Sequence, residues 1–144
     1  MKTKYSSLVS VKKNIMQKSE LALQQANATL QKAREAFETS LLELQSISIP
    51  KQGTISEFLS SRALLDAQRH LIRHNKEWVT FAQEQVNIAK ENLKKTMMDY
   101  EKFKYLELQE IEQIISKRKI KEVKDLDEVA LMTFSNNSTA KAAS

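Results

Sequence analysis

The feature that most constrains the fold of this chain is the near absence of glycine and proline. The 144 residues include one of each, Pro50 and Gly53, and these lie within four positions of each other. Sandwiches, barrels and doubly wound sheets need such residues at many turns, so we expect one turn flanked by two uninterrupted segments. Pro50 should end a first helix near residue 47, and Gly53 can supply a positive φ in the connection.

A second helix should begin just after this turn. Ser56 can cap it, or Thr54 can do so with Glu57 three residues later as a capping box. Gln, Glu, Lys, Leu and Ala are frequent on both sides of the turn, and these residues lose little rotamer freedom in a helix. The expected division is a first helix within residues 1–47, a turn at 48–56, a second helix at 57–134 and a disordered tail at 135–144.

Both segments carry an apolar residue at every seventh position. One seam runs over residues 9–44 and the other over residues 58–100, each without a miss. Two unbroken seams joined by one turn predict an all-α fold, a long antiparallel two-helix coiled-coil hairpin. The layer three residues further along includes polar Gln68 and Asn75 in the second helix, and such residues can fix the register or pair with a partner.

The second helix is expected to be longer than the first. If Ile47 packs near Phe58 across the turn, Leu8 lies opposite Met97, and residues from about 101 onward have no partner in the first helix. Roughly 30 residues of amphipathic helix, about 45 Å, then overhang the N-terminus. An apolar stripe of that length requires another protein to cover it.

The single tryptophan has two readings. Trp78 lies beside the second seam, in line with Leu64 and Leu71. These residues widen the stripe that covers the first helix, or they form a ridge that binds a partner.

Positive charge gathers in two stretches of a chain whose formal net charge is +5. Residues 1–18 hold five lysines and no acid, and residues 117–124 hold five basic residues and one acid. Neither stretch has interleaved aromatic residues or a DNA-binding motif, so we expect no nucleic-acid partner. Solubility, nonspecific anion attraction and an acidic protein cavity are the remaining explanations.

Nothing in the sequence is typical of catalysis or of a membrane span. The chain has no cysteine, no Gly-rich phosphate loop and no nucleophile elbow, so we expect no enzyme activity and no cofactor. His70 and His74 are four residues apart with Asp66 nearby, but they fall on the outer surface and lack a complete ligand set, so we expect no metal. There is no apolar signal segment and no run of about 18 apolar residues, which favours a cytoplasmic protein.

A run near the C-terminal end, Glu122–Ala130, resembles the closing motif of the FliJ family of flagellar type III export components. Glu122 and the Leu126-Asp127-Glu128 run carry the resemblance. The Lys-rich amphipathic start at Tyr5–Lys13, the length and the helical hairpin are also similar to that family, over nearly the whole chain. The resemblance implies a non-enzymatic export component, similar in architecture to the two-helix stalk of the rotary ATPase γ subunit.

The same resemblance implies three partners: the export ATPase hexamer, the cytoplasmic domain of the export gate, and export chaperones. Attachment to the inner membrane would be peripheral and only through the gate. The residues suited to the ATPase ring are Ile111, Ile115, Lys117, Arg118, Lys119 and Leu126. Those placed on the gate-binding surface are Leu41, Leu44, Phe58, Leu64, Leu65, Ala67, Gln68 and Leu71. Two alternatives stay open: a virulence-type secretion stalk, and an unrelated coiled-coil chaperone, spacer or adaptor.

Overall fold

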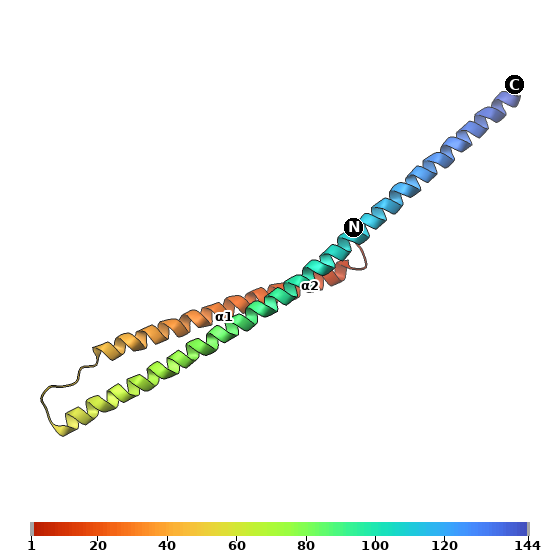
Figure 1. Ribbon diagram of the computed structural model, residues 1–144. Helices are drawn as coiled ribbons and strands as arrows, with labels where there is room; N and C mark the ends of the chain where they lie inside the picture. The colour runs from red at the N-terminus through yellow and green to blue at the C-terminus, as the bar shows by residue number, and fades with distance from the viewer. Residues whose placement is uncertain (1, 144) are drawn as a thin grey trace. The chain divides into compact units, whose positions relative to one another are not determined.

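The computed structural model describes the backbone of residues 2–143 and the side chains of residues 2–137. Within these residues the chain forms two α-helices and no strand, with α1 at Ser6–Ser46 and α2 at Ile55–Ala143 (Figure 1). The predicted all-α fold with a longer second helix is confirmed.

Helix α2 continues beyond Phe134, where the sequence predicts a disordered tail. The backbone of residues 135–143 is helical, and no glycine or proline follows Gly53 in the sequence to end the helix. Ser144 and the side chains from residue 138 onward lie outside the described residues.

The described residues form two compact units. One unit is Lys13–Met98, which contains the turn, and the other combines the residues up to Lys12 with those from Asp99 onward.

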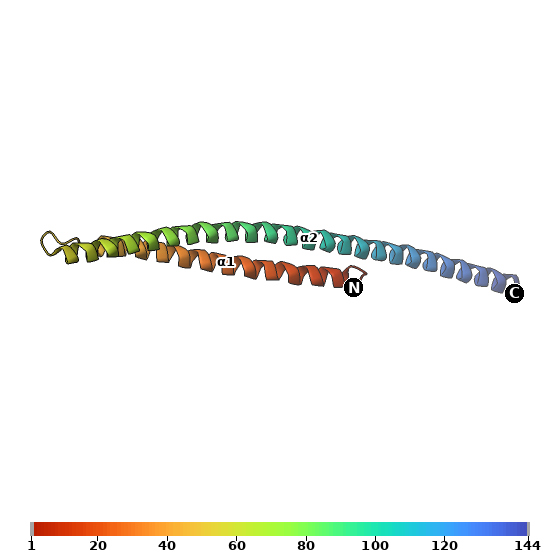
Figure 2. The same ribbon diagram turned by 90° about the horizontal axis from the view of Figure 1, so that it is seen from below.

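In the Lys13–Met98 unit the two helices run antiparallel (Figure 2). They pack along the predicted seams. The buried apolar cluster consists of Leu30 and Ala33 from α1 and Ala82 and Val86 from α2. Ala33 and Ala82 have almost no exposed surface, so small side chains let the two helices approach closely here. The core is therefore thin and depends on few side chains.

Two polar residues of α2 reach across this unit to the backbone of α1. Asn75 is buried, and its Nδ2 donates a hydrogen bond to the carbonyl oxygen of Ala36 at 3.2 Å. Gln68 Nε2 donates to the carbonyl oxygen of Ser40 at 2.7 Å and also to Glu43. Because each amide must meet one particular carbonyl, these residues fix the register of the two helices.

The connection between the helices differs from the prediction at Gly53. No described residue has a positive φ, so Gly53 does not supply one. Instead, the carboxylate of Glu57 occupies the space that a side chain at Gly53 would need. Thr54 is the cap, since its Oγ1 accepts a hydrogen bond from the backbone N–H of Glu57 at 3.3 Å.

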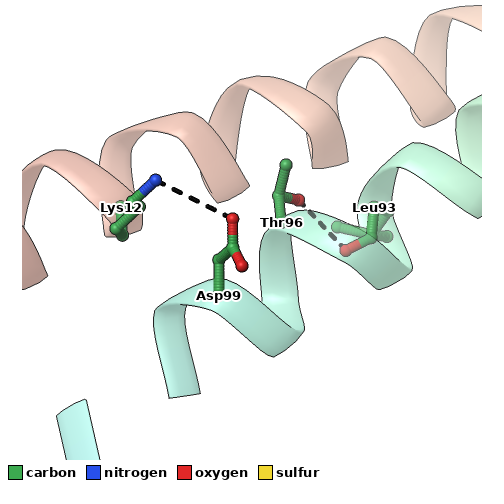
Figure 3. Close-up of polar contacts among 4 residues, drawn as sticks. All are labelled: Lys12, Leu93, Thr96 and Asp99. Carbon is green, nitrogen blue, oxygen red and sulfur yellow. Dashed lines mark hydrogen bonds and ion pairs between the residues drawn. The ribbon is translucent and has the colours of Figure 1, made fainter. Parts of the chain in front are cut away.

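In the unit of the two chain ends, the start of the chain reaches further along α2 than predicted. The rings of Tyr5 and Phe103 lie 6.5 Å apart, and Lys12 Nζ lies 3.8 Å from Asp99 Oδ2 (Figure 3).

The overhang of α2 consequently begins later than residue 101. Half-buried residues recur on α2 as far as Ile114, and the residues from Ile115 to 137 are all exposed. Earlier in α2, within the Lys13–Met98 unit, Thr96 Oγ1 donates a hydrogen bond to the carbonyl oxygen of Leu93 at 3.0 Å (Figure 3). Such a bond is common for a hydroxyl inside a helix.

Candidate partner-binding surfaces

A long exposed surface lies on α2 after Ile114, and we call residues 115–134 the tip surface. All of these residues are exposed. The large apolar ones are Ile115, Ile120, Val123, Leu126, Val129, Leu131, Met132 and Phe134. Their exposed fractions run from 39% at Ile115 to 72% at Phe134. Exposed large apolar residues in this number are typical of a surface that binds another protein.

Of the residues predicted to bind the ATPase ring, all but Ile111 lie within the tip surface, which begins at Ile115. The tip surface contains the exposed residues Ile115, Lys117, Arg118, Lys119 and Leu126. Ile111 lies before it and is half-buried. Lys4 and Tyr5 line one hollow together with Gln113, so the start of the chain covers α2 in the region of Ile111. Ile111 is therefore not part of the freely exposed stripe.

Charge changes sign along the tip surface. Its first part contains the basic residues Lys117, Arg118, Lys119 and Lys121. Its later part contains the acids Asp125, Asp127 and Glu128. The residues that resemble the family motif, Glu122, Leu126, Asp127 and Glu128, are all exposed. They can therefore contact a partner directly and are not needed to fill a core.

A second set of exposed apolar residues lies beside the turn, and we call it the loop-proximal surface. Its members are Leu41, Leu42, Ile55, Phe58, Leu59, Leu64 and Leu71. Of the residues predicted for the gate, those that are exposed are Leu41, Phe58, Leu64, Ala67 and Leu71. The sequence reasoning missed Leu42, Ile55 and Leu59. They could have been found as apolar residues that fall off both seven-residue seams.

The remaining residues predicted for the gate face the other helix. Leu44 and Leu65 lie on the seams and are half-buried. Gln68 is also half-buried, and its amide is engaged by α1 through Ser40 and Glu43. These three side chains are therefore partly covered and are less available to a partner.

One side of the Lys13–Met98 unit carries a shallow groove between the helices. Its lining residues are Ser19, Ala22 and Ala26 from α1 and Gln85, Ile88, Ala89 and Asn92 from α2. Small side chains on α1 leave room there for the side chains of a third helix. Trp78 packs against the buried cluster, so the structure supports the reading in which it covers α1.

The predicted histidine pair and the possibility of a membrane span can be compared with the described residues. His70 and His74 are exposed, and the part of the chain that is described contains no group of three or more His, Asp or Glu side chains able to hold a metal ion. Neither helix, over its described residues, has a stretch apolar enough to cross a bilayer.

The fold defines a class: an antiparallel two-helix coiled-coil hairpin with a longer second helix. A family model described as "Flagellar FliJ protein" matches residues 1–139, and the chain belongs to the FliJ family. It is thus a non-catalytic component of the flagellar export apparatus. The alternative of an unrelated coiled-coil module is excluded by this membership. No curated protein and no solved structure matches the chain significantly.

Proposed function

We propose that the chain binds the export ATPase hexamer through its tip surface. The observation that carries this proposal is the continuous exposure of residues 115–134 on a helix that has apolar residues throughout. A single helix of about 20 residues extends for some 30 Å, which is suited to entry into the central opening of a ring. Exposed apolar residues would supply contact area there, and their burial would supply affinity.

The basic part of the tip surface would direct this encounter. Lys117, Arg118 and Lys119 are consecutive and exposed. A cluster of cations on a helix accelerates association with an acidic opening and makes the rate dependent on salt. Reversing these three charges should slow association and flatten its salt dependence.

We further propose that the loop-proximal surface binds the cytoplasmic domain of the export gate. Leu64 and Leu71 are one heptad apart on α2 and exposed, and Leu41 lies on α1 in the same unit. Two exposed leucines at this spacing lie on one face of the helix, where a partner can bury them together. Association of the chain with the inner membrane would then be peripheral, through the gate.

Export chaperones are the third proposed partner, and the groove between the helices supports this part. Ala22 and Ala26 line it from α1 and Ile88 from α2, an arrangement in which small residues face an exposed aliphatic side chain. A chaperone helix could insert its own apolar side chains into that groove.

Separate binding measurements on the ATPase hexamer and on the gate domain test these assignments. Ile115→Asp and Leu126→Asp should weaken binding to the hexamer by at least about tenfold and leave gate binding unchanged. Leu64→Asp and Leu71→Asp should do the opposite. Leu21→Asp, at an exposed α1 position outside both surfaces, is the matched control and should affect neither. If the tip variants bind the hexamer normally while the loop-proximal variants lose it, the assignment of the tip surface is wrong.

A further inference from the structure

The tip surface has a second property, which does not depend on the ATPase proposal. Most of its basic residues come first along the helix and most of its acidic residues come last, with Glu122 and Lys124 on either side of Val123 between them. Residues 117–121 contain four basic residues and no acid, and residues 125–128 contain three acids and no basic residue. Val123 lies between the two parts and is exposed.

This order makes the tip surface complementary to itself in one orientation. When two copies lie antiparallel with their centres at Val123, residues 117–121 of each copy lie opposite residues 125–129 of the other. The basic part of one helix then meets the acidic part of the other, and the pairing occurs twice by symmetry. In a parallel pair the two basic parts would meet, and so would the two acidic parts. Charges beside an apolar seam are what sets orientation in coiled coils.

The apolar residues fit the same arrangement. Ile120 and Leu126 are equally distant from Val123, so each Ile120 lies opposite a Leu126 of the other copy. Ser116 and Ala130 are also equally distant, and both are small enough for the helices to approach closely. All of these positions are exposed in the single chain.

We propose that the tip surface is an interaction surface for a second copy of this chain, which binds it antiparallel about Val123. The dimer buries the exposed Ile120, Val123 and Leu126 of both copies and pairs their opposite charges. While it persists, these residues are unavailable to any other protein. The association is therefore a way of keeping an apolar helix covered until another partner displaces the second copy.

Charge-reversed chains test the complementarity by sedimentation of the full-length protein over a range of concentrations. The first variant carries Lys117→Glu, Arg118→Glu and Lys119→Glu, and the second carries Asp125→Lys, Asp127→Lys and Glu128→Lys. The dimer dissociation constant of each variant alone should be at least about tenfold higher than that of the unaltered chain, because like charges then face each other. An equimolar mixture should associate at least as tightly as the unaltered chain. A dimer dissociation constant that neither set of charge reversals changes would overturn the proposal.

Orientation is tested by cross-linking, for which the absence of cysteine is an advantage. Chains carrying Ser116→Cys and chains carrying Ala130→Cys should form a disulfide with each other when mixed and oxidised. Neither should cross-link to itself, because identical positions would be about 21 Å apart along the antiparallel pair. Both substitutions are at exposed positions, and circular dichroism should show unchanged helix content.

Three further results would overturn the proposal. Self-cross-linking of each chain without mixed cross-linking would indicate a parallel pair. Strictly monomeric behaviour up to about 100 μM would assign the tip surface to a different protein, since pairs weaker than this have little free energy of association. Cross-linking that persists unchanged with Val123→Asp would place the contact elsewhere.

Discussion

Leu30 is the longest side chain in the buried cluster of the Lys13–Met98 unit, and its replacement by alanine should destabilise that unit strongly. Only 6% of Leu30 is exposed, and the cluster around it consists of Ala33, Ala82 and Val86. The substitution removes three carbon groups, which at ~0.8 kcal/mol each amounts to about 2.4 kcal/mol of transfer free energy. A cavity adds to this loss, since the neighbouring alanines are too short to fill the space. We expect a total of about 3 to 4 kcal/mol, a large part of the stability of a domain this size.

Thermal unfolding followed by circular dichroism measures the effect. At roughly 4 °C or more per kcal/mol, Leu30→Ala should lower Tm by about 12 °C or more. Leu21→Ala is the matched control, because it makes the same change on the same helix at a position that is 54% exposed. It should cost less than about 0.5 kcal/mol. If the two variants unfold at the same temperature, the thin core described above does not hold the hairpin together.

Three further predictions concern the polar contacts. Asn75→Leu should raise Tm, because it replaces a buried polar side chain, and should loosen the helix register as measured by cross-linking of paired cysteines; a lower Tm would show that its bond to α1 is a net stabiliser. Thr54→Ala should cost about 1 kcal/mol and speed hydrogen exchange at the start of α2, whereas Ser56→Ala should do neither; equal effects would reject Thr54 as the cap. Lys12→Gln should change stability by less than about 1 kcal/mol, since its ion pair is partly exposed to solvent; a larger loss at low salt would mean that this pair holds the two chain ends together.

The seams could be predicted from the sequence because heptad periodicity survives in the packed helices. The buried residues Leu30 and Val86 lie on the predicted seams, and Ala33 and Ala82 lie three residues further along. Seven-residue spacing specifies which face is buried and leaves the alignment of the two faces undetermined. The alignment depends on where the turn ends and on which backbone carbonyls accept hydrogen bonds from Gln68 and Asn75. Seven-residue spacing encodes neither of these.

The overhang of α2 starts later than the expected residue 101, because seven-residue spacing leaves the alignment of the two helices undetermined. With Tyr5 beside Phe103, the covered part of α2 extends to Ile114, so Ile111 is half-buried where the shorter alignment leaves it exposed. Gly53 does not adopt the positive φ that glycine permits without requiring it. Because Gly53 has no side chain, the carboxylate of Glu57 can occupy the space beside it.

Hydrogen exchange across the whole chain, with and without the export ATPase hexamer, tests most directly the claim that the tip surface is the site of partner binding. The chain should be at a concentration low enough to be monomeric. In the chain without the hexamer, the backbone amide hydrogens of residues 115–134 should exchange faster than those of residues 78–93, because residues 115–134 have no packed neighbour to oppose local opening. With the hexamer present, protection should rise in residues 115–134 and stay constant around Leu64 and Leu71. Protection that appears around Leu64 and Leu71 while the tip surface continues to exchange rapidly would contradict the account.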